Sequence, residues 1–496
     1  MEKHKPVKNI LSISDLNYEQ LFNVILPKCE KEIPFVEKRI PRESDPTKKV
    51  QLLFTEPSTR TRGSNIEAVE LLGYRYDQVI GEEASALAKR ESLANTARMF
   101  AKYNAGVIVA RTKIEGAQKF MAKLLEKDEC QCAVHNAGDG TNQHPTQTIL
   151  DLLTLKRHLG RLDDLTIGFF GDLKYGRTVH SLLSALSYRS GINVVLVDTP
   201  ETKLQKQYRE LFPAVTESDE MEALVDCDVV YGARIQEERF DFDPIILARL
   251  RARFTVTSQL LNSLKKNVII MHPMPYVQEF PPDVRKDKRI IIDDQAWCGV
   301  PVRVALLKLS FENLETKVFP EDRPDIVLDT IEDVSLAEYR LHKARKNEEE
   351  NQYFYPIDCG TVIDHIPVST GPKIKQFLIA RGQLKNEGPV HLIDRIKKTR
   401  HEEKEVLILR NNFLEDRVKM AIVSLSPMVT FNEISGEKFR KIKANIPSKV
   451  YGFGKCPNKT CITNNDPEAV PTFTHTTAGS LKCWYCEKEF LRDEVI

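Results

Sequence analysis

The sequence predicts an α/β protein that begins with two doubly wound parallel-sheet subdomains and ends with a small α+β domain and a cysteine-bearing β domain. Three observations favour this fold class. Short apolar runs alternate with helical patterns from residue 50 to about residue 313, a charge-rich stretch then interrupts the alternation, and four of the ten cysteines gather in residues 446–496. Sheets of this kind bind ligands at the carboxyl ends of their strands.

Length and charge restrict the classes of function. The 496 residues suggest about three domains of ~150 residues each, and the formal net charge of +1 gives no overall field towards nucleic acid or membranes. No run approaches about 18 apolar residues, and the N-terminus lacks an apolar signal core. We therefore expect a cytoplasmic protein that binds neither nucleic acid nor membranes.

The first half of the alternation begins with a helical segment, residues 7–46, which starts near Ser14 and is expected to break at Pro27, Pro34 and Pro41. Buried-type strands follow at 50–54, 106–110 and 133–136. A helix is predicted between the first two of these strands, ending at Gly73, and another over 145–158.

The second half repeats the pattern. Strands are predicted at 165–170, 193–198, 227–231 and 267–271, with a helix over 177–189 and a closing helix over about 301–313. The strand–glycine–helix order at 165–198 also mimics a dinucleotide-binding fold, but Gly168, Gly171 and Gly176 do not have the G-x-G-x-x-G spacing.

These patterns divide the chain into five parts. The first subdomain is residues 1–145, completed by the helix at about 295–316, and the second is residues 146–294. Residues 317–352 are rich in Glu, Asp, Lys and Arg and are predicted to form a charged linker. A smaller α/β unit, 353–445, opens with a strand at 360–367, and residues 446–496 hold the cysteines.

A candidate phosphate site lies at the turn between the first strand and its helix. Ser58, Thr59, Arg60 and Thr61 place hydroxyls and a guanidinium where the first helical N–H groups have no partner and the helix dipole is positive. A simple helix cap followed by a solvated arginine explains the same residues, so the motif alone leaves both interpretations open.

Other polar residues follow predicted strands directly. Each could be structural when taken singly, but together they would meet at one edge of the sheets. They are Arg111, His144 with Gln147, Arg234 with Gln236, and the run His272-Pro273-Met274-Pro275.

Two short cysteine pairs predict a metal site. Cys456 and Cys461 are separated by four residues, and Cys483 and Cys486 by two, which suits a closed, structural zinc site of four thiolates better than four unlinked thiols. The surrounding segment mixes Lys with Glu and Asp and has no basic stripe for nucleic acid. We expect zinc as a structural ion and no organic cofactor.

Four motifs in order resemble those of aspartate carbamoyltransferases, and the chain is similar to a fusion of that family's catalytic and regulatory chains. The resemblance covers nearly the whole chain outside the linker. The motifs are Ser58-Thr59-Arg60-Thr61-Arg62, Asn136-Ala137-Gly138-Asp139-Gly140 through His144-Pro145-Thr146-Gln147, Gly171-Asp172 through His180, and His272-Pro273-Met274-Pro275.

The resemblance implies a function and a site. The function is transfer of a carbamoyl group from carbamoyl phosphate to L-aspartate, giving N-carbamoyl-L-aspartate and phosphate for pyrimidine biosynthesis. The implied catalytic residues are Arg60, Thr61, Lys89, Arg111 and His144. Carbamoyl phosphate would be bound by Ser58, Thr59, Arg60, Thr61, Ser85, Lys89, Arg111, His144, Gln147 and Pro275. L-Aspartate would be bound by Lys89, Arg177, Arg234 and Gln236.

The resemblance also implies an assembly. Residues 1–145 would be the carbamoyl-phosphate-binding subdomain and 146–294 the aspartate-binding subdomain of a trimer-based homo-oligomer, in which neighbouring copies share active sites through Ser85 and Lys89. The zinc domain would dock regulatory onto catalytic parts. Tyr276 replaces a basic residue that often follows the proline motif, so aspartate-side contacts are expected to differ.

The middle domain resembles the family's nucleotide-binding regulatory domain. Asp364, His365, Lys404 and Asn432 match residues that contact the effector. Two further lysines of the family's pocket align with Ile408 and near Ile442, and an apolar residue cannot counter a triphosphate. We therefore expect nucleotide regulation to be weak or lost and the domain to be mainly architectural.

Two alternative functions remain open at this point. The first is carbamoyl transfer to another amine, such as ornithine, although Pro273 stands where ornithine-type enzymes have cysteine and the arginines suit carboxylates better. The second is a non-catalytic scaffold that senses nucleotides through residues 353–496. An assay with each amine, and a search for nucleotide binding without product, would separate the three.

Overall fold

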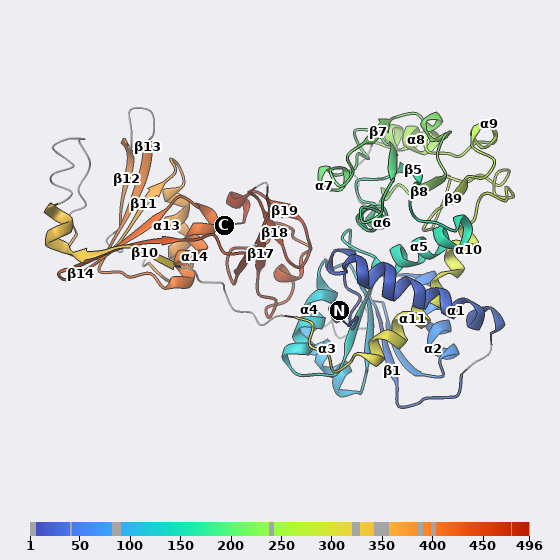
Figure 1. Cartoon of the computed structure of the whole chain (residues 1–496), viewed down its shortest axis with the longest axis horizontal. Coiled ribbons are helices and arrows are strands. Elements are labelled where there is room, and N and C mark those ends of the chain that lie inside the picture. The colour runs from blue at the N-terminus through green and yellow to red at the C-terminus, as the bar shows by residue number, and fades with distance from the viewer. Residues whose placement is uncertain are drawn as a thin grey trace. The chain divides into compact units, whose positions relative to one another are not determined.

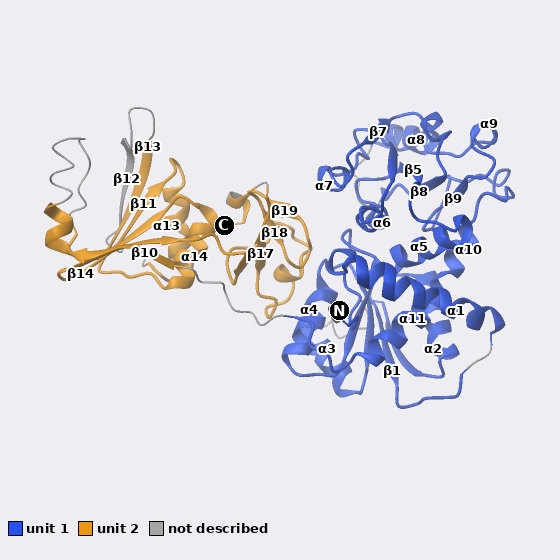
Figure 2. Cartoon of the chain, viewed as in Figure 1, with its two compact units in different colours: residues 1–320 blue, residues 321–496 orange. Residues whose placement is uncertain are grey.

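The computed structural model divides into two compact units, residues 1–320 and 321–496 (Figure 2), and each is described by itself. The residues described are 6–39, 42–81, 91–237, 243–319, 328–341, 357–384, 390–397, 403–477 and 479–495.

The first sheet of unit 1 is parallel, with strand order β2-β1-β3-β4 (Figure 1). Its strands are β1 (Lys49–Phe54), β2 (Arg75–Ile80), β3 (Val107–Thr112) and β4 (Ala133–Asp139). The accompanying helices are α2 (Thr59–Leu71), α3 (Leu93–Lys102) and α4 (Ala117–Lys127). Strands β1, β3 and β4 are buried nearly throughout, as expected for a parallel sheet covered on both faces.

The second sheet is also parallel, with order β7-β6-β5-β8-β9. Its strands are β5 (Thr166–Gly171), β6 (Asn193–Val197), β7 (Val215–Ser218), β8 (Val229–Ala233) and β9 (Ile269–Met271). Its helices include α6 (Arg177–Leu186), α7 (Lys206–Arg209), α8 (Pro244–Arg253), α9 (Ser258–Ser263) and α10 (Ile292–Trp297). The prediction of two doubly wound parallel sheets is confirmed.

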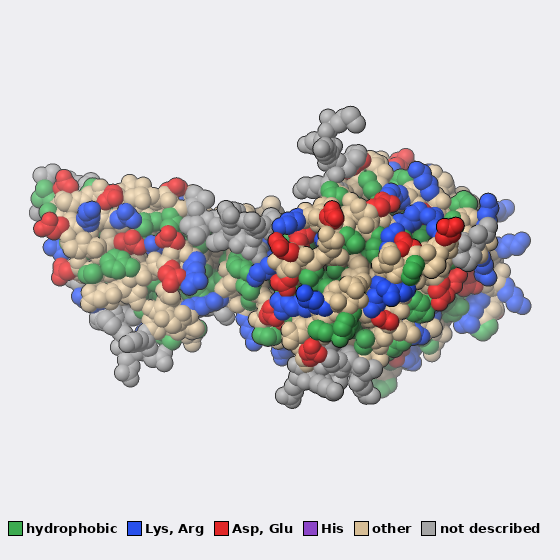
Figure 3. All heavy atoms as spheres, turned by 90° about the horizontal axis from the view of Figure 1, so that it is seen from below, with side chains coloured by type: hydrophobic (Ala, Val, Ile, Leu, Met, Phe, Trp, Pro, Cys, Tyr) green, Lys and Arg blue, Asp and Glu red, His purple; other side chains and the backbone are tan. Residues whose placement is uncertain are grey.

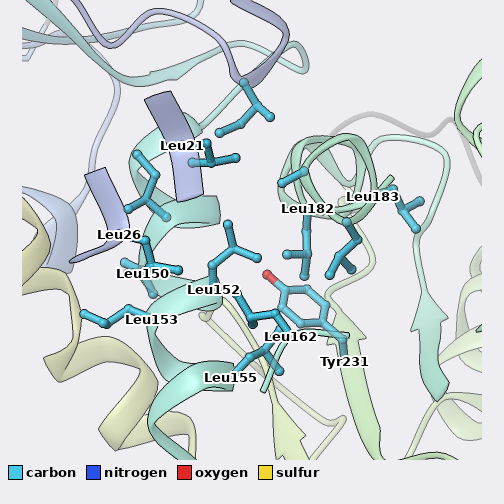
Figure 4. Packing of buried hydrophobic residues seen from close by; sticks show 14 of the residues in the cluster. Leu21, Leu26, Leu150, Leu152, Leu153, Leu155, Leu162, Leu182, Leu183 and Tyr231 are labelled. Atoms are coloured by element: carbon cyan, nitrogen blue, oxygen red, sulfur yellow. The ribbon is translucent and has the colours of Figure 1, made fainter. Parts of the chain in front are cut away.

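Three helices near the junction of the sheets share one core. Helix α5 (Pro145–Leu159) contacts both α1 (Leu26–Lys38) and α11 (Gly299–Glu312), and it also contacts α6 of the second sheet. Figure 4 shows leucines of α5 and α6 around Tyr231 of β8, whose hydroxyl oxygen is directed towards α5. A single apolar cluster therefore reaches from the N-terminal helices into the second sheet.

The predicted breaks at Pro27 and Pro34 are wrong. A π-helical turn, Glu19–Ile25, runs directly into α1, which contains both prolines. Because the helix is continuous from residue 19 to residue 38, the missing N–H of each proline removes one helical hydrogen bond, but apolar packing of α1 against the core keeps the helix unbroken. The predicted break at Pro41 lies outside the described residues.

Unit 2 contains an antiparallel six-stranded sheet with order β10-β15-β14-β11-β13-β12. Its strands are β10 (Leu328–Ser335), β11 (Cys359–Ile366), β12 (Val390–Lys397), β13 (Glu403–Arg410), β14 (Thr430–Ser435) and β15 (Lys438–Ala444). Its described helices include α13 (Gly371–Ala380) and α14 (Asp416–Leu425).

Strand β10 lies inside the range predicted as a charged linker, so that prediction needs correction there. The strand pairs along β15 from Leu328 opposite Ala444 to Ser335 opposite Lys438, while most of its side chains remain exposed or half-buried. Backbone pairing at a sheet edge tolerates a charged sequence, and composition alone cannot reveal it.

The C-terminal part of unit 2 is a small antiparallel sheet. It consists of β16 (Lys449–Tyr451), β17 (Thr472–His475), β18 (Leu481–Cys483) and β19 (Glu489–Phe490), in that order. The α+β domain and the cysteine-bearing β domain were both predicted. Within the described ranges, no helix combines the length and apolar character needed to cross a bilayer.

Candidate active site

A cavity of about 470 Å³ opens in unit 1 where the carboxyl ends of the central strands of both sheets meet. Its walls come from segments far apart in the sequence: the start of α2, the end of β3, the starts of α5 and α6, and the loops after β8 and β9. Among its lining residues are Ser58, Thr59, Arg60, Thr61, Arg111, His144, Gln147, Arg177, Arg234, Gln236 and Pro275. The structure therefore brings together all the sequence-predicted substrate-binding residues that it describes.

The start of α2 presents the predicted phosphate cradle. Ser58 is the N-cap residue, with an extended backbone, yet its hydroxyl makes no capping hydrogen bond within the described helix. Thr59, Arg60 and Thr61 form the first turn, whose N–H groups and dipole favour an anion. The geometry therefore favours an anion-binding site over a simple helix cap.

Arg111 and Arg177 face each other across the carboxylate of Glu56. Glu56 Oε2 lies 3.2 Å from Arg111 Nε and 3.5 Å from Arg177 Nη1. Burial and the neighbouring Arg177 lower the pKa of Arg111 to about 9, while Glu56 opposes the shift, so the guanidinium stays charged at neutral pH. The cavity therefore concentrates positive charge in a partly desolvated place, where it attracts anions strongly.

Glycine at position 138 permits this pairing of arginines. Its φ of +117° is unfavourable for other residues, and a Cβ there would lie 3.1 Å from both Arg111 Nη1 and Arg177 Cζ. Arg111 Nη1 donates to the carbonyl of Ala137 at 3.2 Å, and Arg177 Nη1 donates to that of Gly140 at 2.6 Å. The loop after β4 thus fixes both guanidiniums through its backbone.

His144 is a buried, neutral imidazole beside these cations. Burial is the largest cause of its strongly lowered pKa, followed by the charges of Arg177, Arg111 and Arg303. Its Nδ1 lies 3.4 Å from the hydroxyl of Thr146. When that hydroxyl donates to Nδ1, the ring carries its proton on Nε2 and can donate a hydrogen bond to a ligand.

Gln147 and the loop containing Pro275 lie on the carbamoyl side of the predicted site. Gln147 Nε2 donates to Asp151 at 2.9 Å. In the loop after β9, the backbone N–H of Met274 donates to His272 Nδ1 at 2.9 Å, and that of His272 donates to Gln295 Oε1 at 2.8 Å. Side chains behind the cavity therefore hold both elements in place.

Arg234 and Gln236 follow β8 and line the same cavity. The backbone N–H of Gln236 donates to Asp172 at 3.2 Å, and its Nε2 donates to the carbonyl of Tyr175 at 2.6 Å. Burial, with the charges of Arg234 and Arg60, lowers the pKa of His272 to about 3. The charge of Arg60 and that of Arg234 therefore reach the same part of the cavity.

Two predicted residues and several unpredicted ones complete the comparison with the sequence. Ser85 and Lys89 lie outside the described residues. Glu56, Arg303 and Gln295 line the cavity and were not predicted. Glu56 lies two residues before Ser58, and an acidic side chain so near the predicted phosphate site is a signal that the sequence displays, whereas nothing local in the sequence marks Arg303 or Gln295.

The four predicted effector residues lie on three neighbouring strands of unit 2. Lys404 pairs with Asp364 at 2.6 Å, and His365 Nδ1 lies 3.5 Å from Asp364 and 3.3 Å from the Thr430 hydroxyl. Asn432, on β14, lies opposite Val362 of β11. Ile408 and Ile442 are 2% and 3% exposed, so both belong to the core.

The four C-terminal cysteines form a cluster that fits a zinc ion. All four side chains are buried, and their Sγ atoms lie within 4.8 Å of one another. Cys456 Sγ is 3.7 Å from Cys486 Sγ, and Cys461 Sγ is 3.8 Å from Cys483 Sγ. Four thiolates arranged tetrahedrally at Zn–S bonds of about 2.3 Å would be about 3.8 Å apart. The set thus offers a closed site whose metal would hold this small domain together.

Comparison with protein families finds four matches along the chain. Residues 8–157 match the aspartate/ornithine carbamoyltransferase carbamoyl-P binding domain, and residues 163–310 match the Asp/Orn binding domain of the same family. Residues 354–445 match the allosteric domain of the aspartate carbamoyltransferase regulatory chain, and residues 448–496 match its metal binding domain.

Individual proteins show the same likeness for unit 1. The aspartate carbamoyltransferase catalytic subunit of Thermoplasma volcanium is 38% identical over 304 residues, which is 60% of this chain and 97% of that protein. The corresponding protein of Methanothrix thermoacetophila is 40% identical over 313 residues, covering 62% and 99%.

Solved structures agree with the sequence relatives. The M. jannaschii aspartate transcarbamoylase catalytic subunit superposes with a TM-score of 0.57 at 36% identity, covering 62% of this chain and all of that one. The Trypanosoma cruzi enzyme in complex with N-(phosphonacetyl)-L-aspartic acid gives a TM-score of 0.55 at 30% identity, covering 62% and 96%.

Proposed function

The chain belongs to the aspartate carbamoyltransferase family, with catalytic, allosteric and metal-binding domains in one polypeptide, and from this premise we propose which side chains carry the reaction. The reaction transfers the carbamoyl group of carbamoyl phosphate to L-aspartate, giving N-carbamoyl-L-aspartate and phosphate for pyrimidine biosynthesis. The observation that carries the assignment of roles is one cavity lined by Arg60, Arg111, Arg177 and Arg234, because both substrates are anionic.

Ser58, Thr59, Arg60 and Thr61 hold the phosphate of carbamoyl phosphate in this proposal. The first turn of α2 offers N–H groups and hydroxyls, and Arg60 adds a planar guanidinium that suits phosphate oxygens. The Glu56 carboxylate lies near both Arg111 and Arg177. A bound anion would compete with its carboxylate for both arginines, so binding would rearrange these ion pairs.

The carbonyl oxygen of the carbamoyl group is directed to Thr61, Arg111 and His144. The neutral aspartate amine attacks the carbonyl carbon, a C–N bond forms, and the C–O bond to phosphate breaks. The departing phosphate takes the electron pair of that bond and the proton that the amine loses. Negative charge builds on the carbonyl oxygen before the C–O bond breaks. Fixed donors stabilise that charge, and neutral His144 serves as a donor without adding a further buried cation.

Gln147 and the backbone carbonyl of Pro275 accept hydrogen bonds from the carbamoyl amide. Arg177, Arg234 and Gln236, which line the same cavity, hold the two carboxylates of L-aspartate. This arrangement brings the amine to the carbonyl carbon in one orientation, which supplies much of the rate enhancement expected of a two-substrate site.

The direct experiment is an amine-specific assay. Purified protein with carbamoyl phosphate should form N-carbamoyl-L-aspartate from L-aspartate, and L-ornithine should give no more than the rate without amine. Product formation from ornithine at a comparable kcat/KM, or nucleotide binding with no product from either amine, would refute the assignment.

We propose a trimer-based homo-oligomer in which Ser85 and Lys89 of one copy complete the site of its neighbour. The support is the family resemblance at these two positions. Mixing inactive Arg60→Ala and Lys89→Ala proteins tests it, because mixed oligomers would contain some sites with both residues intact and regain activity. Failure of mixed oligomers, shown by mass to have formed, to regain activity would exclude shared sites.

We propose that the allosteric domain is mainly architectural. Asp364 already neutralises Lys404, and the buried side chains of Ile408 and Ile442 supply no charge for a triphosphate. Titration of the intact protein with ATP, CTP and UTP should therefore give weak or no heat at millimolar nucleotide. Tight binding that is lost in Lys404→Ala would contradict this role.

Surface charge and domain limits complete the proposal. Cationic and anionic side chains are interspersed over the face of the molecule in Figure 3, which supports a protein without nucleic-acid or membrane partners. We propose that it acts in the cytoplasm. We retain the boundaries 1–145, 146–294, 317–352, 353–445 and 446–496 as proposed domain limits, with β10 reassigned from the linker to the allosteric sheet.

A further inference from the structure

Behind the cavity, one fully buried carboxylate receives three hydrogen bonds from three different elements. Asp151, on α5, accepts from Gln147 Nε2 at 2.9 Å and from Gln295 Nε2 at 2.7 Å on the same oxygen, Oδ1. Its other oxygen, Oδ2, accepts from the hydroxyl of Tyr231 at 2.9 Å. Burial raises the pKa of Asp151 to about 7, and the three hydrogen bonds oppose that shift.

The contact with Asp151 determines which end of the Gln147 amide faces away from it. Oδ1 accepts from two amide nitrogens, so any proton that Asp151 takes up would lie on Oδ2, facing the Tyr231 hydroxyl. Gln147 therefore turns its nitrogen to Asp151 and presents its carbonyl oxygen elsewhere. Gln147 also lines the cavity. A glutamine without this partner could rotate its amide and offer N–H groups to the ligand instead.

We propose that Asp151 is a positioning residue that fixes Gln147 as a hydrogen-bond acceptor and thereby makes the site select a carbamoyl group over an acyl group that lacks the amide. The inference rests on the proposed role of Gln147. The carbamoyl NH₂ is a donor, so it pairs with a carbonyl oxygen and is repelled by an amide N–H. Acetyl phosphate, in which a methyl replaces NH₂, gains nothing from that acceptor.

The hydrogen bond from Gln295 to Asp151 affects the second proposed acceptor of the carbamoyl amide, the backbone carbonyl of Pro275. Gln295 donates to Asp151, which leaves its Oε1 to accept the backbone N–H of His272 at 2.8 Å. His272 begins the loop that contains Pro275. The same carboxylate therefore orients the side-chain acceptor directly and the loop with the backbone acceptor through one glutamine.

The third hydrogen bond to Asp151, from the Tyr231 hydroxyl, connects two elements of the fold and orients neither glutamine. Tyr231, on β8, points its hydroxyl at α5 from within the leucine core (Figure 4), so its hydrogen bond ties α5 to the second sheet. Removing this hydroxyl takes one partner from Asp151 but leaves both glutamine contacts in place. Tyr231→Phe is therefore a matched control for the general cost of disturbing the network.

Two substitutions at position 151 distinguish the role of the acceptor oxygen of Asp151 from the role of its negative charge. Asp151→Leu removes the acceptor and excludes water from the space. Asp151→Asn keeps an oxygen facing both glutamines while its amide donates to the Tyr231 hydroxyl, which can accept. The asparagine variant should thus retain the orientation of Gln147 without the negative charge.

The experiment compares kcat/KM for carbamoyl phosphate and for acetyl phosphate at saturating L-aspartate, with phosphate release as readout and thermal unfolding of each variant as a check. Asp151→Leu should lower the preference for carbamoyl phosphate about tenfold or more, since one substrate hydrogen bond disappears and an unpaired polar group remains. Its kcat/KM for acetyl phosphate should stay within about threefold of wild type. Asp151→Asn and Tyr231→Phe should keep the wild-type preference.

Several results would overturn the inference. An unchanged preference in Asp151→Leu, while Gln147→Ala loses it, would show that Gln147 needs no orienting partner. If Asp151→Leu lowers kcat/KM equally for both substrates, the carboxylate contributes to stability alone. If Asp151→Asn loses the preference as fully as Asp151→Leu, the negative charge of the carboxylate determines it and not the acceptor oxygen. If Asp151→Leu does not fold, Asp151→Ala takes its place under the same criteria. An unchanged preference in Gln147→Ala would instead refute the role proposed for Gln147, and with it this inference, while leaving the enzyme's activity established.

Discussion

Replacing Arg60 with alanine is expected to remove activity without harming the fold. Arg60 is the second residue of α2 and is exposed at the mouth of the cavity, and within the described ranges its guanidinium forms no ion pair. Alanine is a better helix former than arginine or its equal, so the substitution should leave the unfolding temperature unchanged. We therefore expect the side chain to contribute to ligand binding and not to stability.

The magnitude follows from the hydrogen bonds that Arg60 would make to phosphate. A guanidinium forms charge-assisted, commonly bidentate hydrogen bonds with phosphate, and removing one such transition-state donor costs about 3–4 kcal/mol. We therefore expect kcat/KM for carbamoyl phosphate to fall by about 10²–10³-fold, since each 1.36 kcal/mol is a factor of ten.

Arg62→Ala is the matched control for this experiment. It removes the same charge from the same helix, but Arg62 Nη1 is directed to Gln78 on β2, 3.5 Å away, and Arg62 does not line the cavity. Its kcat/KM should stay within about threefold of wild type, because a half-buried charge outside the cavity contacts no substrate. Arg60→Ala with near-normal kcat/KM and an unchanged unfolding temperature would refute the proposed phosphate cradle.

Three further predictions follow from the same structure. Arg234→Ala should raise KM for L-aspartate about tenfold or more and leave KM for carbamoyl phosphate within about threefold, by steady-state kinetics; equal changes would contradict a separate aspartate side. His135 is buried, and burial lowers its pKa from 6.5 to about 3. Because the unfolded state takes up a proton that the folded state excludes, stability is lost as the pH falls below 6.5. As the pH is lowered from 6 to 4, the free energy of unfolding of His135→Asn, measured with urea, should rise relative to that of wild type by about 1.4 kcal/mol per pH unit. Parallel pH profiles of the two proteins would exclude this. The protein should contain about one zinc per chain by elemental analysis. Cys461→Ser should lower that content and the unfolding temperature of residues 446–496, whereas a metal-free wild-type protein with the same unfolding temperature would argue against a structural ion.

The sequence predicts the parts of the site in which local pattern and chemistry coincide. Ser58–Thr61 and His144–Gln147 each follow an apolar strand run, so their place at a strand end could be inferred before the fold was known. The cysteine spacing likewise specifies its ligands. These features depend on neighbours a few residues away, which a single sequence displays directly.

The rest depends on long-range contacts. Asp151 and Gln295 are 144 positions apart, and each reads locally as an ordinary helical residue. Strand β2 was not predicted because neither of its faces is apolar throughout, and β10 was not predicted because backbone pairing holds a charged sequence at an edge. Pro34 shows the converse, since packing against the core overrides a local helix breaker.

The central claim is that one cavity holds both anions through arginines from both sheets, and binding of a bisubstrate analogue tests it most directly. Isothermal titration with N-(phosphonacetyl)-L-aspartic acid should show about one site per chain, with affinity about 100-fold weaker in Arg60→Ala and in Arg234→Ala alike, since each removes a charged group that binds one end of the same ligand. Carbamoyl phosphate should compete with the analogue. Equal affinity in wild type and both variants, or a weaker affinity in only one of them, would contradict a single shared cavity.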